Sequence, residues 1–270
     1  MISFQVVLIG VVMVLALVGM IACAKKQRTN PNAQPIAIAL LIIVVICGIA
    51  ILVKTGTLGD NANEKLIQNE MKFASSTAIV LGEELKAAYP GEKVLVVVDR
   101  NFDKNARQQK LVEGLKQGLG SIAEVVTDTL VIESLKKNDT PPAPGAPPPE
   151  EDIMPLEEIM KAVDFDAVIE KHPNCKIVIS LIGLPRDLTT MKTWTLENRP
   201  KVALLNADVH SLAPLIKGGY IVAAVSYCPG VKFSEDPAPD DPKAAFDLRY
   251  IMITPKNIEE LAQKYQGLFQ

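Results

Sequence analysis

The chain has 270 residues, a net charge of −3 and 49% hydrophobic residues. Four of its 28 basic residues and none of its 31 acidic residues lie at or before Lys54, so the remainder carries a net charge of −7. This acidic remainder has no basic cluster, which excludes nucleic acid as an expected partner because binding to phosphates needs grouped lysine and arginine.

The hydrophobic excess is concentrated in the first fifty-odd residues. Residues 2–24 and 36–53 contain no charged side chain, and each run is close to the roughly 20 residues that cross a hydrocarbon core of about 30 Å. We expect two transmembrane helices that form a hairpin anchor over residues 1–54. A lipoprotein signal ending at Cys23 is the alternative, but the first five residues lack the basic side chain of such signals.

The turn between the two runs, residues 25–35, sets the expected orientation. It contains Lys25, Lys26 and Arg28 and no acidic residue, so the positive-inside rule places it in the cytoplasm. The chain is then expected to be an integral protein of a bacterial inner membrane, with an extracytoplasmic domain. Neither run contains an ionisable residue, which indicates an anchor rather than a transport pathway.

Residues 61–88 are predicted to form one helix, within a juxtamembrane segment spanning residues 55–92. Six apolar residues recur at spacings of three and four, as in a heptad seam. They are Ile67, Met71, Ala74, Ala78, Leu81 and Leu85. Two interpretations stay open, a stalk through which copies self-associate and a first domain helix that lies on a sheet. The two alanines and the short link at residues 89–91 favour the second.

Residues 93–270 alternate between apolar strands and amphipathic helices. Strands are predicted at 93–99, 122–132, 175–182, 201–205, 220–225 and 249–253, and helices at 104–119, 155–171, 188–197, 209–217 and 257–269. This alternation predicts an α/β fold with a mostly parallel, doubly wound, Rossmann-like sheet of about six strands. The proline-rich insertion at 140–152 fits neither a helix nor an inner strand, and we expect a solvated loop, with a docking peptide as the alternative.

Five stretches give this part of the chain a resemblance to a known family. They are KVLVVVDRNF from residue 93, QQKLVEGLKQGLG from 108, IVISLIGLP from 177, VALLNAD from 202 and GGYIVAAVSY from 218. Together they resemble one Rossmann-like lobe of a type I periplasmic binding protein, over roughly residues 93–268. Such proteins close two lobes around a ligand. This chain has strands for one lobe, so a cleft inherited from that family would need a second subunit.

Polar side chains follow the predicted strands, at the edge where open parallel sheets bind ligands. The candidates for binding a small polar ligand are Asp99, Asn101, Arg186, Asn206, Asp208 and Tyr227. Carboxylate and amide groups here could hydrogen-bond a polyol or an amine, and Arg186 could hold a carboxylate. Residues such as Asp187 and Asp208 also precede helices, so a role as N-caps stays open.

No enzymatic motif is found in the sequence. A phosphate-binding loop, a dinucleotide fingerprint, a nucleophile elbow and a metalloprotease motif are all missing, so we predict no cofactor, no metal site and no catalytic residue. Cys228 and His210 lie in neighbouring loops, but such a pair is usually unrelated. Cys175 and Cys228 are expected at opposite sheet edges, too far apart for a disulfide. His172 is expected to complement a helix dipole.

We therefore expect a non-enzymatic, membrane-anchored subunit whose α/β domain binds protein partners or copies of itself. The alternative is a solute-binding or sensory lobe that resembles half of a periplasmic binding protein. A hydrolase or transferase is the second alternative.

Overall fold

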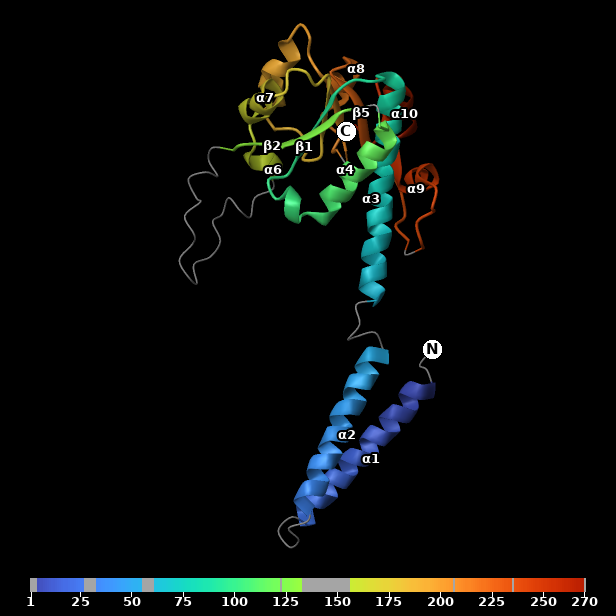
Figure 1. Cartoon of the computed structure of the whole chain (residues 1–270). Coiled ribbons are helices and arrows are strands. Elements are labelled where there is room, and N and C mark those ends of the chain that lie inside the picture. The colour runs from blue at the N-terminus through green and yellow to red at the C-terminus, as the bar shows by residue number, and fades with distance from the viewer. Residues whose placement is uncertain are drawn as a thin grey trace. The chain divides into compact units, whose positions relative to one another are not determined.

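The computed structural model describes residues 4–26, 33–54, 61–121, 123–132, 156–205, 207–234 and 236–269 (Figure 1). The chain divides into two compact units, Met1–Gln68 and Asn69–Gln270. The predicted insertion at 140–152 lies outside the described residues, as does most of the turn at 25–35.

The first unit contains two long helices, α1 (Phe4–Lys26) and α2 (Ala33–Lys54), which pack against each other. At Gly19 an added Cβ would come within 3.1 Å of the Leu40 side chain, so the glycine allows the two helices to approach closely. Both helices were predicted at nearly these bounds. Within the described ranges, however, no helix qualifies as long and apolar enough to cross a membrane, so the transmembrane assignment of the hairpin is not supported.

The second unit is built on a six-stranded sheet in the order β2-β1-β3-β4-β5-β6. The strands are β1 (Val94–Val98), β2 (Val125–Thr129), β3 (Ile177–Ser180), β4 (Lys201–Leu204), β5 (Ile221–Tyr227) and β6 (Tyr250–Ile253). The first five are parallel, and β6 is antiparallel to β5. The predicted mostly parallel α/β sheet is therefore confirmed.

Helices cover both faces of this sheet. One face packs against α3 (Asn61–Ala88), α4 (Ala106–Leu119) and α9 (Pro242–Arg249). The other packs against α7 (Ala162–Glu170), α8 (Ala213–Lys217) and α10 (Ile258–Lys264). Successive strand residues point to opposite faces of the sheet. Val94 and Val96 therefore pack in the core beneath α3, α4 and α9, while Leu95 and Val97 pack in the core beneath α7, α8 and α10. The continuous β-branched run of β1 is thus buried on both sides.

The predicted seam on α3 faces the sheet instead of a second copy. Ala74, Ala78, Leu81 and Leu85 are buried in the core with β1 and β3. Of the other two seam positions, Met71 is half-buried and Ile67 lies in the first unit. These four positions belong to the core of the unit, as expected from the favoured interpretation of a first domain helix that lies on a sheet, because the valine-rich face of the sheet needs a cover and α3 provides it.

Helices α3 and α4 touch through their backbones. A Cβ built on Gly118 would lie 2.2 Å from the Ile79 carbonyl oxygen, and one on Gly82 would lie 2.9 Å from the Leu115 carbonyl oxygen. Only glycine fits where two helix backbones approach so closely. Figure 1 shows the two helices side by side.

Several connections differ from the prediction. The helix expected at 155–171 is divided into α6 (Leu156–Ile159) and α7, and the helix expected at 188–197 consists of two 3₁₀ turns, η3 (Leu188–Thr190) and η4 (Lys192–Thr195). A further 3₁₀ turn, η1 (Phe102–Lys104), precedes α4. Helix α9 was not predicted, although Asp241 accepts a hydrogen bond from the Ala244 backbone N–H and Pro242 follows it, which is a typical helix start.

Candidate functional site

The connections that leave β1 and β3 diverge to opposite faces of the sheet. After β1 the chain passes through η1 to α4 on the face covered by α3, whereas after β3 it passes to η3 and η4, which pack in the opposite core. Because β1 and β3 are neighbours, this divergence is a topological switch point, where open α/β sheets bind ligands. The carboxyl ends of these two strands are the candidate site.

The loop after β1 is held by side-chain hydrogen bonds. The Asp99 carboxylate accepts from the Asn101 backbone N–H at 2.8 Å, and the Asp99 N–H donates to the Gln108 side chain at 2.9 Å. Asn105 caps α4 by accepting from the Gln108 N–H at 3.1 Å. One carboxylate oxygen of Asp99 thus holds the turn that follows β1, and Asn101 is exposed in this turn.

The loop after β3 is closed by Ser180, a fully buried residue. Its hydroxyl donates to the Gly183 carbonyl at 2.6 Å and accepts from the Ile182 N–H at 3.3 Å. Gly183 adopts a φ of +77°, a backbone conformation that favours glycine. Arg186 is exposed and lies six residues after the end of β3.

Asp187 acts as a cap, but for a different helix from the expected one. Its carboxylate accepts from the Ala162 N–H at 2.8 Å, at the start of α7, and makes no capping bond to η3, which follows it. A pocket of about 220 Å³ lies beside this contact, lined by Asp187, Thr190 and the first turns of α7. The loop after β3 and the start of α7 are therefore fixed to each other.

The remaining candidates are spread along the same edge. Asp208 follows β4 and accepts from the His210 backbone N–H at 3.1 Å, which is again a local turn contact. Tyr227 ends β5 and stacks on Tyr250 with ring centroids 5.0 Å apart. Three strand spacings separate β1 from β5, or roughly 14 Å at about 4.8 Å each. Asn206 lies outside the described residues. The loops that carry Asp99, Asn101 and Arg186 follow the neighbouring strands β1 and β3, whereas Asp208 follows β4 and Tyr227 ends β5, further along the edge.

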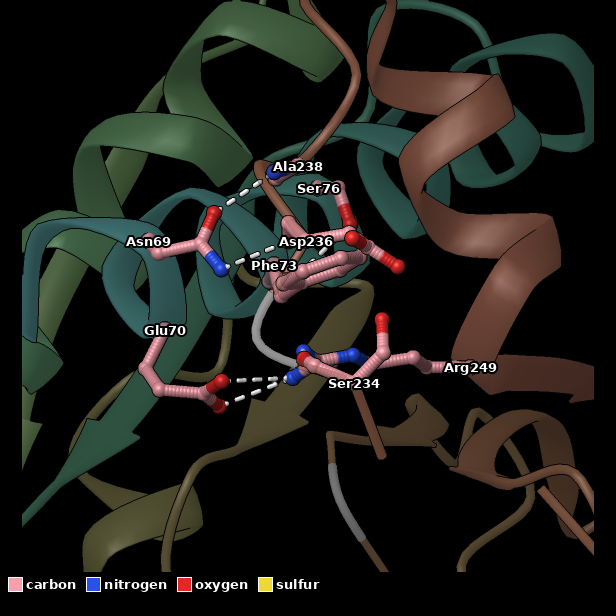
Figure 2. Close-up of polar contacts among 8 residues, drawn as sticks. All are labelled: Asn69, Glu70, Phe73, Ser76, Ser234, Asp236, Ala238 and Arg249. Carbon is pink, nitrogen blue, oxygen red and sulfur yellow. Dashed lines mark hydrogen bonds and ion pairs between the residues drawn. The ribbon is translucent and has the colours of Figure 1, made fainter. Parts of the chain in front are cut away.

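A buried arginine that no sequence pattern indicated, Arg249, lies near the β5–β6 end of this edge. Its guanidinium donates to both carboxylate oxygens of Glu70 at 2.7 and 2.9 Å and to the Ser234 carbonyl at 3.1 Å (Figure 2). The guanidinium carbon lies 3.4 Å from the centroid of the Phe73 ring. Glu70 precedes Arg249 by 179 positions, so no local pattern could have connected them.

The two histidines have different partners from those considered in the sequence. The Nε2 atom of His172 lies 2.8 Å from the Asp128 carboxylate on β2, a contact that the sequence did not indicate. Burial alone would raise the pKa of Asp128, but hydrogen bonds from His172 and the Thr129 N–H, with the charge of Lys171, lower it on balance. His210 lies nearest Asp208, at 3.9 Å.

The domain cysteines have no catalytic or metal-binding arrangement in the described ranges. Cys175 precedes β3 and Cys228 follows β5, so they lie at opposite edges of the sheet, and both are free thiols. The Cys228 sulfur lies 3.6 Å from the Tyr265 hydroxyl. The described residues hold no group of three or more His, Cys, Asp or Glu side chains that could bind a metal ion.

Comparison with known proteins yields only structural neighbours. No protein-family model and no curated protein sequence matches the chain. A sugar-binding protein of a sugar ABC transporter from Bacillus halodurans matches with a TM-score of 0.42 and 12% identity, covering 69% of this chain and 64% of that one. A glucose-galactose binding protein from Geobacillus stearothermophilus matches with a TM-score of 0.40 and 12% identity, covering 68% and 61%.

A putative LacI transcriptional regulator from Bacteroides fragilis also matches, with a TM-score of 0.42 and 10% identity, covering 69% of this chain and 61% of that one. This chain thus spans less than two thirds of each neighbour's length. These neighbours are sugar-binding proteins and a LacI regulator, and the likeness is of low identity and covers part of each chain.

Proposed function

We propose that the α/β unit is a solute-binding or sensory lobe that binds a small polar ligand at the carboxyl ends of β1 and β3. The observation that supports this most is the divergence of the chain between these neighbouring strands, with Asn101 and Arg186 exposed at that point. In this proposal the Asn101 amide hydrogen-bonds a hydroxyl group, while Arg186 binds a carboxylate through two parallel N–H bonds. A second copy or a partner protein covers the ligand from the other side.

Thermal unfolding with small ligands tests this proposal. Pentoses, hexoses and small hydroxy acids are the probes, and a ligand that binds only the folded chain raises its Tm with the logarithm of ligand concentration above the Kd. We expect a shift in the wild type that Arg186→Ala abolishes while the Tm without ligand stays unchanged. Arg199→Ala removes a guanidinium from the opposite edge of the sheet and should keep the shift. An equal shift in Arg186→Ala would contradict the proposed site.

We further propose that α1 and α2 hold the chain at a bacterial inner membrane, with the turn at 25–35 in the cytoplasm and the α/β unit outside. The support is the uncharged sequence of residues 4–24 and 34–53 and the exposure of large aliphatic side chains such as Leu15, at 66%, and Ile46, at 59%. An apolar surface of this kind is stable only against lipid or another protein.

Alkaline extraction of membranes tests the anchor. We expect the full chain to stay in the membrane pellet and Leu15→Glu/Ile46→Glu to shift toward the soluble fraction, because charge at these positions is costly in lipid. Asp247→Ala, on the exposed face of α9, is the control and should stay in the pellet. Alkaline phosphatase fused after residue 270 should be active. A soluble wild-type chain, or an inactive fusion, would contradict the proposal.

A further inference from the structure

The segment between β5 and α9, described over residues 228–234 and 236–241, lies at the β5–β6 end of the sheet, and we call these residues the strap. Most of its described residues are exposed, including Lys232, Phe233 and Asp236, and Ala238 alone among them is buried. A segment with so few buried apolar contacts opens at a lower free energy than the strands beside it. Its position therefore depends on the polar contacts that hold it.

The first of these contacts comes from Asn69, near the middle of α3. Its side-chain amide donates to the Asp236 carbonyl at 3.0 Å, and its side-chain oxygen accepts from the Ala238 N–H at 2.6 Å (Figure 2). An amide side chain is one of the few groups that can donate and accept at once, as a neighbouring backbone would. Asn69 thus holds two backbone groups of the strap in one position.

The second contact comes from Arg249, at the end of α9. It donates to the Ser234 carbonyl, and its guanidinium lies between the rings of Phe73, at 3.4 Å, and Phe233, at 5.4 Å. Glu70 on α3 binds the same guanidinium. Asn69, which makes the first contact, therefore lies in the same stretch of α3, residues 69–73, as the two residues that orient Arg249. These two residues are Glu70 and Phe73.

Aromatic side chains lie behind the strap. Phe233 meets the Tyr227 ring edge-on at 5.5 Å, and Tyr227 stacks on Tyr250, which is 4% exposed. Displacement of the strap would remove Phe233 from Tyr227 and Ser234 from Arg249. It would also give solvent or a bound molecule access to the buried Tyr250 ring, whereas Tyr227 is already 43% exposed.

We propose that the strap opens and closes over the buried Tyr250 ring, and that Asn69 on α3 holds it closed. The proposal does not depend on a ligand at β1 and β3, since the strap lies at the other end of the edge. Opening is a local event that leaves the sheet folded.

Limited trypsin digestion of the full chain tests the proposal, because Lys232 is an exposed cleavage site in the strap. We expect Asn69→Ala to speed cleavage after Lys232 about tenfold, which corresponds to the loss of two ordinary hydrogen bonds when cleavage follows the open population. Asn257→Ala is the matched control, because Asn257 holds a different loop by accepting from the Thr254 N–H and donating to the Met252 carbonyl. It should leave cleavage at Lys232 unchanged.

Hydrogen exchange of the wild-type chain provides a second test that needs no variant. Amides of residues 234–241 should exchange at least about a hundredfold faster than those of β5 and β6 if the strap opens separately. Equal protection of strap and strands would overturn the proposal. So would an Asn69→Ala chain that is cleaved at Lys232 at the wild-type rate, or one in which every tryptic site is cleaved faster by the same factor.

Discussion

Arg249 shows how a single buried charge depends on its partners. Its side chain is 4% exposed while that of Glu70 is 51% exposed, so the carboxylate remains hydrated and the guanidinium does not. Loss of the carboxylate would leave a buried cation whose other partners, among the residues that the structure describes, are the Ser234 carbonyl and aromatic rings. Such a cation is costly, whereas an exposed ion pair contributes little.

Two alanine substitutions on α3 compare the loss of the partner of a buried cation with the loss of an exposed ion pair. We expect Glu70→Ala to lower the free energy of unfolding by about 2 kcal/mol, less than for a fully buried pair because solvent screens Glu70. Lys72→Ala breaks an exposed pair with Asp240 and should cost less than about 0.5 kcal/mol. Urea unfolding measures both. Equal effects would show that burial of Arg249 does not set the strength of the contact.

Tyr250 makes stability sensitive to alkaline pH. Burial raises its pKa well above the ordinary 10.0, the neighbouring Tyr227 raises it further, and Arg107 and Arg249 oppose the shift. The unfolded chain therefore ionises this phenol at a lower pH than the folded chain does. Its contribution to stability is fully present below about pH 10 and is lost as the pH rises from there.

Urea unfolding at pH 8 and pH 10.5 tests this effect. We expect the wild type to lose more stability between the two values than Tyr250→Phe, which keeps the ring and cannot ionise. Parallel losses in the two proteins would show that other groups cause the alkaline sensitivity.

At the residue scale, hydrogen bonds between residues close together in the sequence were predictable, whereas contacts between residues far apart in the sequence were not. The alternative that aspartates after strands close turns or cap helices holds for Asp99, Asp208 and Asp187, since each accepts a backbone N–H. The partner of Asp187 was missed because it lies 25 positions away, in a helix that follows the proline-rich insertion. Arg249 and the His172–Asp128 pair were missed for the same reason.

At the scale of elements, the contact between α3 and α4 is the most demanding. An alanine at 118 would place its Cβ 2.2 Å from a backbone oxygen, and a backbone cannot move aside as a side chain can. We expect Gly118→Ala to lower stability by about 3 kcal/mol through overpacking. Gly267→Ala, which has no atom within 4 Å of the new Cβ, is the control and should be neutral in thermal unfolding. A neutral Gly118→Ala would mean that the two helices separate easily.

Strands were predicted better than helices because five of them are buried, apolar and short. Strand β1 was predicted within one residue at each end, while α7 and α8 proved shorter than the apolar patterns that predicted them. Where the chain turns as 3₁₀ segments, as at η3 and η4, the spacing of apolar residues resembles that of a helix. The length of a helix is then decided by how it packs against the sheet, rather than by the spacing of apolar residues along the sequence.

At the scale of the whole molecule, the class of fold followed from the alternation of strands and helices, but the position of the candidate site did not. Six candidate residues were predicted along one edge without a strand order. The order β2-β1-β3 is what selects Asp99, Asn101 and Arg186, because it identifies where the connections diverge. Strand order depends on contacts between distant segments, which a single sequence does not reveal.

The burial of α3 also determines how the chain can be divided for expression. A fragment that begins at Lys93, where the strand–helix alternation begins, would lose Ala74, Ala78, Leu81 and Leu85 and uncover the face of Val94 and Val96. We expect this fragment to aggregate and a fragment from Asn61 to elute as one sharp peak in size-exclusion chromatography. A soluble, folded fragment from Lys93 would contradict this expectation. Any useful truncation of the protein must therefore start upstream of the first strand, before a helix that a sequence-based boundary would discard.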